Sequence, residues 1–212
     1  MKAWKFTMLM LIAILIACGK QPNTATPSYK DPLGPSSTLT DEERRSESVE
    51  ELLKLYISLQ YSSDVKDIRI TDVRRESGNQ LFYSCMFRYN GQEYMGMFYV
   101  QELENNLFQG EVFDGFPVIE EEPLQLLIGG GGLHEDRVNR DYSFTMGYSH
   151  DVEISTVYVE HRNGQVMVYP ITDEKLFLDV FIGDLYTPVS VIAVNDNGDV
   201  IFEKTYNRDH VK

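Results

Sequence analysis

The most regular hydrophobic pattern in the chain predicts a helix over residues 47–61. Its apolar side chains recur every three or four residues, as they do along one face of an α-helix: Val49, Leu52, Leu53, Tyr56, Ile57 and Leu59. Ser48-Val49-Glu50-Glu51 matches the capping box that begins helices, and Thr40-Asp41-Glu42-Glu43 offers an earlier start. A stripe of this width is typical of packing on a core, and a partner-binding helix is the alternative.

Alternating apolar and polar residues after the helix predict antiparallel strands. Residues 65–75 alternate loosely, residues 81–100 form a hairpin, and a further strand is expected near residues 107–116. Asn90-Gly91 is the preferred pair for a two-residue turn. This turn sets five pairs opposite each other: Arg88 and Glu93, Phe87 and Tyr94, Cys85 and Gly96, Tyr83 and Phe98, and Leu81 and Val100.

A helix followed by an antiparallel sheet of about four strands predicts an α+β domain over residues 40–120. This order of elements resembles the cystatin-like and NTF2-like architectures. One face of the hairpin suits the helix, and the other carries a candidate interaction face that consists of Phe82, Met86, Met95, Met97 and Tyr99. This second face is either a contact surface for another molecule or is covered by residues 107–128.

The pattern from residue 141 onward consists of strands alone. Short segments rich in Val, Ile, Tyr and Phe are separated by turn signals at Asn163-Gly164, Gly183-Asp184 and Asn197-Gly198. The first turn would place Tyr158 opposite Tyr169 and Val159 opposite Val168. Residues 191–201 resemble the last hairpin of immunoglobulin-like modules in secreted bacterial proteins, so residues 141–212 are expected to form an all-β, immunoglobulin-like sandwich.

Residues 121–140 change in character and predict a Gly-rich linker between the two domains. Gly129, Gly130, Gly131 and Gly132 are consecutive, and four glycines leave the backbone unrestrained. The run lacks the Gly-Lys-Ser/Thr ending of a phosphate-binding loop. An alternative organisation is one continuous sheet structure without a linker.

Residues 1–17 are typical of an export signal. Lys2 and Lys5 precede an uncharged run, residues 6–17, which would span only about 18 Å as a helix and so falls short of the roughly 30 Å of a bilayer core. Leu15-Ile16-Ala17-Cys18 resembles the lipobox of bacterial lipoproteins, and the overall organisation resembles lipoproteins of Gram-positive bacteria. The resemblance implies cleavage before Cys18, a covalent diacylglycerol on its sulfur and no other cofactor. A plain secretory signal with a chance cysteine is the alternative.

The lipobox resemblance predicts a lipid-anchored protein on the extracytoplasmic face of the cell membrane. Residues 18–39 are rich in proline and hydroxyl groups and are expected to form a disordered tether. The net charge of −14 argues against nucleic acid and against direct docking on anionic headgroups. The second cysteine, Cys85, is expected to be a buried structural thiol and not a nucleophile.

Candidate catalytic residues are few. Ser149, His150 and Asp151 are adjacent, but neighbours on a strand point to opposite faces, so they do not form a triad. No residue is therefore assigned a catalytic role. A metal site would need the two units to meet and bring His134, Glu135 and Asp136 close to His150 and Asp151.

These features predict a non-enzymatic binding or interaction protein of the bacterial cell envelope. Its membrane contact is the lipid, and its partner is an envelope protein or a wall component. The alternative is an envelope hydrolase or metal-dependent enzyme with a site near His134–Asp136 and His150–Asp151, which would require a polar pocket where these side chains converge.

Overall fold

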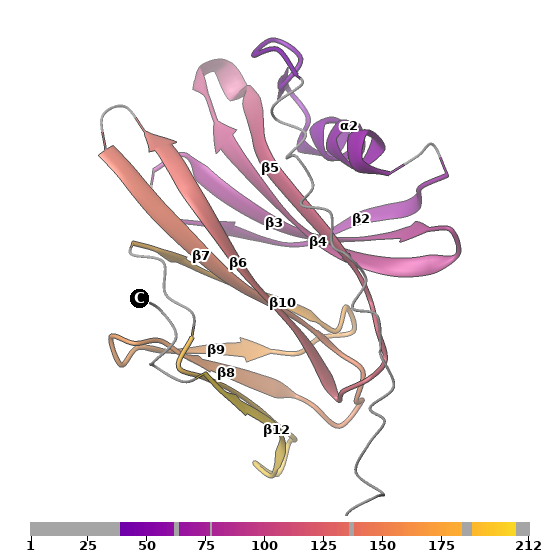
Figure 1. The fold of residues 1–212 in the computed structure, drawn as a ribbon, viewed down its shortest axis with the longest axis vertical. Helices are drawn as coiled ribbons and strands as arrows, with labels where there is room; N and C mark the ends of the chain where they lie inside the picture. Colours follow the sequence, from indigo (N-terminus) through magenta and orange to yellow (C-terminus); the bar gives the residue numbers. More distant parts are fainter. Residues whose placement is uncertain (1–38, 62–63, 77, 136–137, 184–187, 207–212) are drawn as a thin grey trace, which may run out of the picture. The chain divides into compact units, whose positions relative to one another are not determined.

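A computed structural model describes residues 39–61, 64–76, 78–135, 138–183 and 188–206, without the side chains of residues 134, 135 and 138–140. The described residues form one α-helix, α2 (Val49–Gln60), and three antiparallel sheets (Figure 1). Sheet A has the strand order β1 (Arg45–Ser46), β5 (Phe108–Pro117), β4 (Gln92–Glu102), β3 (Gln80–Tyr89) and β2 (Lys66–Arg75). Sheet B has the order β10 (Leu176–Ile182), β7 (Val138–Ser149) and β6 (Leu124–Glu135). Sheet C has the order β12 (Val200–Thr205), β11 (Ser190–Val194), β8 (Thr156–Glu160) and β9 (Val166–Pro170). A short 3₁₀ turn, η2 (Glu104–Asn106), joins β4 to β5.

The predicted fold class, an α+β domain followed by an immunoglobulin-like sandwich, is wrong. The described chain is mostly β, with a single short helix and three antiparallel sheets. The physical reason is the segment from residue 124 to residue 149, which forms two long paired strands that pack on sheet A. Strand β10 joins these two strands and is therefore unavailable to a separate C-terminal sandwich.

Helix α2 begins and ends close to the predicted positions. The hydroxyl of Ser48 accepts a hydrogen bond from the Glu51 amide, as the capping pattern predicted. The apolar stripe packs on sheet A, where the Tyr56 hydroxyl donates to the Gly110 carbonyl at 2.5 Å. A Cβ atom at Gly110 would lie 2.6 Å from the Tyr56 ring, so this strand position requires glycine. No helix in the described ranges is long and apolar enough to cross a membrane.

The predicted register of the β3–β4 hairpin is confirmed. All five predicted pairs, from Arg88 and Glu93 at the turn to Leu81 and Val100, lie opposite each other. Asn90 and Gly91 both have positive φ, as a type I′ turn requires. The two-residue turn fixes the register, and the register in turn fixes which side chains face α2.

Sheet B is covered on both faces. Leu178 of β10 and Met146 of β7 pack with Phe82 of sheet A on one face. On the other face, Phe177 of β10 and Leu126 of β6 pack on sheet C (Figure 1). The described residues therefore form four layers in the order α2, sheet A, sheet B and sheet C, and each layer shares an apolar core with the next.

The predicted register of the β8–β9 hairpin is wrong by one residue. Tyr158 lies opposite Val168 and Val159 lies opposite Met167. The His161 amide donates to the Gln165 carbonyl, so three residues and not two form the turn. Gly164 has a φ of 81°, the left-handed geometry that closes a three-residue hairpin loop.

The four glycines predicted to form a linker lie in strand β6. Gly129 pairs with Phe144 and Gly131 pairs with Tyr142 across the β6–β7 hairpin. The aromatic rings lie over these glycines, because an added Cβ atom at Gly129 would lie 2.6 Å from the Phe144 ring. The glycines thus supply the space that two buried aromatic side chains of β7 occupy, and residues 124–135 of the expected linker form a paired strand.

This arrangement predicts opposite outcomes for two alanine substitutions in the same run. Gly129→Ala should destabilise the fold by about 1–3 kcal/mol, since the added methyl group would lie 2.6 Å from the buried Phe144 ring and would force that ring to shift. Gly132→Ala adds its methyl group to open space and should change stability by less than about 1 kcal/mol. Urea unfolding of both variants measures the difference, and equal losses would contradict the packing described here.

Candidate functional site

The predicted interaction face is not a surface in this structure. Its five residues are between 0% and 4% exposed: Phe82, Met86, Met95, Met97 and Tyr99. They pack against Tyr142, Phe144 and Leu178 of sheet B. The segment 107–128 that was expected to cover them contributes as well, because Val112, Val118 and Leu127 pack against the same cluster. The face is apolar because it is the interface between sheets A and B.

The structure does not bring the predicted metal ligands together. His134 and Glu135 lie in β6 at the turn end of the β6–β7 hairpin, whereas His150 and Asp151 follow β7 at the opposite end. Ten residues of β7 separate the two ends, which corresponds to about 33 Å. Asp136 lies outside the described residues. No group of three His, Cys, Asp or Glu side chains within the described ranges is placed to hold a metal ion.

Cys85 is fully buried between α2 and sheet A. Burial raises the pKa of its thiol to about 12, since an apolar environment disfavours the thiolate. A thiol with this pKa is a poor nucleophile near neutral pH.

A buried polar cluster lies between sheets B and C around Asp179, which is 1% exposed. The Tyr169 hydroxyl donates to Asp179 Oδ1 at 2.5 Å, and His161 Nε2 lies 3.1 Å from Asp179 Oδ2. Burial, followed by the charge of Asp179, raises the pKa of Tyr169. The tyrosine therefore stays neutral and acts as a hydrogen-bond donor to the carboxylate.

A cavity of about 260 Å³ adjoins this cluster, and residues from all three sheets line it. We call it the junction cavity; its lining residues are Arg74, Glu76, His161, Gln165, Met167, Tyr169, Val180, Phe181 and Ile182. The Arg74 guanidinium lies over the Tyr169 ring, with Cζ 5.1 Å from the ring centroid. Burial and the nearby Asp179 charge raise the pKa of Glu76. Ionisable groups from sheets A, B and C therefore lie close together at this cavity.

The sequence analysis missed this cluster, although a signal for it is present. Asp179 is the only charged residue in Leu176–Ile182, a strand that is otherwise apolar on both faces. A carboxylate is rarely buried unless hydrogen-bond donors accompany it. The isolated aspartate could therefore have indicated a buried polar site, but nothing in the sequence identifies Tyr169 and His161 as its partners.

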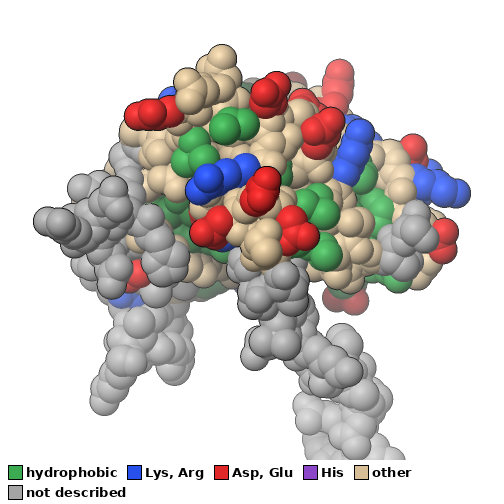
Figure 2. All heavy atoms as spheres, turned by 90° about the horizontal axis from the view of Figure 1, so that it is seen from above, with side chains coloured by type: hydrophobic (Ala, Val, Ile, Leu, Met, Phe, Trp, Pro, Cys, Tyr) green, Lys and Arg blue, Asp and Glu red, His purple; other side chains and the backbone are tan. Residues whose placement is uncertain are grey.

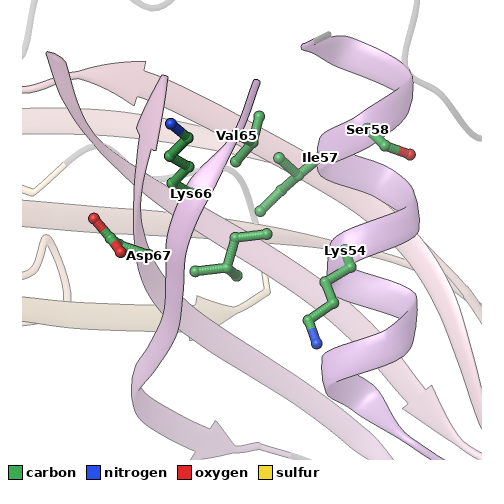
Figure 3. A pocket seen from close by; sticks show the side chains of 7 residues that line it. Lys54, Ile57, Ser58, Val65, Lys66 and Asp67 are labelled. Carbon is green, nitrogen blue, oxygen red and sulfur yellow. The ribbon is translucent and has the colours of Figure 1, made fainter. Parts of the chain in front are cut away.

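A second hollow, of about 490 Å³, lies between helix α2 and strand β2. Figure 3 shows Ile57 of the helix and Val65 facing each other across it, and Lys54 lies on the helix side. Lys66 lies on the strand side of the same α2–β2 hollow. Neither lysine forms an ion pair with an acidic side chain of the described residues, whereas the neighbouring Arg69 and Arg88 do.

An irregularity in β2 accompanies the α2–β2 hollow. The register with β3 shifts between Lys66 and Arg69, and Asp67 has a φ of 54°. A bulge bends its strand, and a left-handed residue other than glycine is strained unless its surroundings hold it in place. Asp67 lies 3.7 Å from Arg88, and this ion pair supports the bulge.

Exposed apolar side chains gather on the outer face of sheet C. Tyr158 and Val168 pair across β8 and β9 and are 36% and 53% exposed, while Val166 and Val200 add to the same face. Figure 2 shows another face of the molecule, on which acidic and basic side chains are interspersed with small apolar areas. Sheet C therefore provides an apolar face in a chain that is otherwise strongly acidic.

Comparison of the chain with known protein families, with curated proteins and with solved structures finds no match. The kind of ligand that the junction cavity and the α2–β2 hollow could bind is therefore inferred from their lining residues.

Removal of the Tyr169 hydroxyl should destabilise the fold. Tyr169→Phe leaves a buried carboxylate oxygen without its donor, which costs about 1–3 kcal/mol. Tyr158→Phe is the matched control, because that ring is exposed and should change stability by less than about 0.5 kcal/mol. Chemical denaturation measures both variants. A Tyr169→Phe variant as stable as the control would show that the buried cluster contributes no stability.

Proposed function

We propose that the protein is a lipid-anchored, extracytoplasmic binding protein that takes an anionic, amphipathic component of the cell envelope into the α2–β2 hollow. The observation that supports binding is the pairing of an apolar wall with two lysines that lack described acidic partners. Ligand sites in proteins commonly combine an apolar lining with a few polar groups that fix the orientation. The proposed function is binding, without catalysis.

The apolar and charged parts of the hollow match the two ends of such a ligand. Ile57, Val65 and Ile68 offer surface to an alkyl body. The ammonium groups of Lys54 and Lys66 attract a carboxylate or phosphate head. Asp67 also lines the hollow, but it is paired with Arg88 at 3.7 Å. In a chain with a net charge of −14, the two lysines without described acidic partners therefore make the hollow locally favourable for an anion.

The lipid anchor is supported by residues 2–18 alone, which lie outside the described residues. A positive start, a short apolar run and the lipobox-like Leu15-Ile16-Ala17-Cys18 favour acylation of the cysteine. Two or three acyl chains suffice for stable anchoring, whereas one is marginal. An anchored protein would meet envelope amphiphiles at high local concentration.

Decanoate, used as a probe, should bind with a dissociation constant below about 1 mM, and decanol should bind more weakly because it lacks the charge. Lys54→Gln and Lys66→Gln should each weaken decanoate binding by about two- to fivefold, the range expected for an exposed ion pair. Isothermal titration calorimetry at low and high salt measures both effects, and the losses should shrink as salt screens the charges. Decyl phosphate in a parallel titration tests which anionic head is preferred.

Lys204→Gln is the matched control, because Lys204 is an exposed lysine on β12 of sheet C. It removes the same charge away from the hollow and should leave binding unchanged. Equal weakening in all three variants would indicate a general charge effect and would contradict a site in the α2–β2 hollow.

The anchor is tested separately by intact-mass analysis of the chain produced in a lipoprotein-processing bacterial host. The expected species begins at Cys18 and carries a diacylglycerol, and Cys18→Ser should abolish this modification. A mature species that begins at Met1, or one with an unmodified thiol at Cys18, would exclude the anchor and leave the ligand proposal to be judged on the titrations.

A further inference from the structure

Two residues that line the junction cavity carry three buried nitrogen atoms without hydrogen-bond partners. Within the described part of the chain, Arg74 Nε, His161 Nδ1 and His161 Nε2 are shielded from solvent and form no hydrogen bond. Buried polar atoms are nearly always paired in folded proteins, so each unpaired atom indicates a missing water or ligand. Both residues line the same cavity, and His161 is 3% exposed.

Arg74 Nε and His161 Nδ1 have opposite hydrogen-bonding roles. Arg74 Nε carries a hydrogen and can only donate. His161 Nε2 lies 3.1 Å from Asp179 Oδ2 without forming an aligned hydrogen bond, and the negative charge of the carboxylate favours the proton on this nearer nitrogen. Nδ1 is then left as an acceptor. A molecule that satisfies both atoms must therefore offer a donor and an acceptor.

The charges around the cavity favour a cationic donor. Glu76 lines the cavity, and Asp179 lies directly behind His161. The one cation in the lining, Arg74, is already paired with Asp72 at 2.8 Å. The remaining lining is neutral or apolar, from Gln165 and Met167 to Phe181 and Ile182. The carboxylates therefore exceed the cations, and a bound cation would relieve the repulsion between the Glu76 and Asp179 carboxylates.

The cavity volume suits a small molecule. A volume of 260 Å³ corresponds to about nine water molecules at roughly 30 Å³ each. Free amino acids and single amino sugars are of this size, and polymers are not. The flat ring of Phe181, stacked on His161, and the side chains of Met167 and Ile182 provide apolar contact for the ligand body.

We infer that the junction cavity is a second binding site, separate from the α2–β2 hollow, for a small ligand that carries a cationic amine beside an oxygen acceptor. The ammonium group donates to the Glu76 carboxylate and to His161 Nδ1, and the oxygen accepts from Arg74 Nε. Phe181 and Met167 contact the carbon skeleton. The site does not depend on the proposed function, because no residue is shared with the α2–β2 hollow.

Two amines, L-alanine and glucosamine, test whether the oxygen acceptor of the ligand is a carboxylate or a hydroxyl group. L-alanine presents a carboxylate beside its amine, and glucosamine presents a hydroxyl, whereas N-acetylglucosamine retains the size but lacks the charge. Titration of the full chain, followed by NMR chemical shifts, should detect at least one of the two amines with a dissociation constant below about 1 mM, and the N-acetyl analogue should bind more weakly. The preferred amine identifies the oxygen acceptor. No binding of either amine at 10-fold higher concentration, or equal binding of the uncharged analogue, would overturn the inference.

Glu76→Gln should weaken binding of the preferred amine by at least about tenfold, because it replaces a charged acceptor with a neutral amide. Glu76 is exposed enough at its strand end to be replaced without loss of the fold. Glu104→Gln makes the same change in η2, outside the cavity, and should leave binding unchanged. A Glu76→Gln variant that binds as tightly as the native chain would overturn the assignment of the ammonium site.

Two substitutions of the histidine test the role of Nδ1. The longer amide of His161→Gln can reach Asp179 but leaves the Nδ1 position empty, whereas His161→Asn places an amide oxygen near Nδ1. Binding should be lost in the first variant and partly retained in the second, with folding of both checked by near-UV circular dichroism. Folded variants that both bind normally would exclude His161 from the site, and a greater loss in His161→Asn would contradict the proposed acceptor.

Discussion

The structure depends on the burial of sheet B on both faces. Its three strands must supply apolar or small residues to sheet A on one side and to sheet C on the other. Leu178 and Phe177 are neighbours on β10, yet they belong to different cores. Gly147 of β7 makes room for the Phe177 ring of the neighbouring strand on the face toward sheet C, because a Cβ atom there would lie 2.3 Å from that ring. Loss of sheet B would leave the Met-rich face of sheet A and the inner face of sheet C both uncovered.

Much of the local structure could be predicted from the sequence, because helix caps and tight turns leave short-range signals. Ser48 and the Asn90-Gly91 turn are sufficient to fix α2 and the register of β3 with β4. The layer order could not be predicted, because a strand buried on both faces loses the alternation that shows which side is solvated. The glycine run carried a misleading signal, since its meaning depends on Phe144 and Tyr142, which lie across the hairpin.

The candidate sites, like the fold, could be predicted where they depend on residues close in sequence, and not where they depend on residues far apart in sequence. The α2–β2 hollow combines an expected helix with an expected strand, but the bulge at Asp67 that accompanies it has no clear sequence signal. The junction cavity requires side chains from β2, from the β8–β9 turn, from β9 and from β10, and β2 is far from the others in the chain. Asp179 is visible in the sequence as an isolated acid, whereas its contact with His161 follows only from the packing of sheet C on sheet B.

The order of strands along the chain has a consequence for how the molecule is assembled. Strands β8 and β9 of sheet C lie in the sequence between β7 and β10 of sheet B, and β11 and β12 follow afterwards. If the chain becomes free to fold from its amino terminus onward, sheet A can form first. Met86, Met95 and Met97 then stay uncovered until β7 and β10 are also free to fold. Until then, a large apolar surface faces the solvent. Partly folded intermediates with such a surface are prone to aggregate. A holding chaperone where the chain folds would matter most until residues 117–182 have arrived, because the surface is uncovered during that interval.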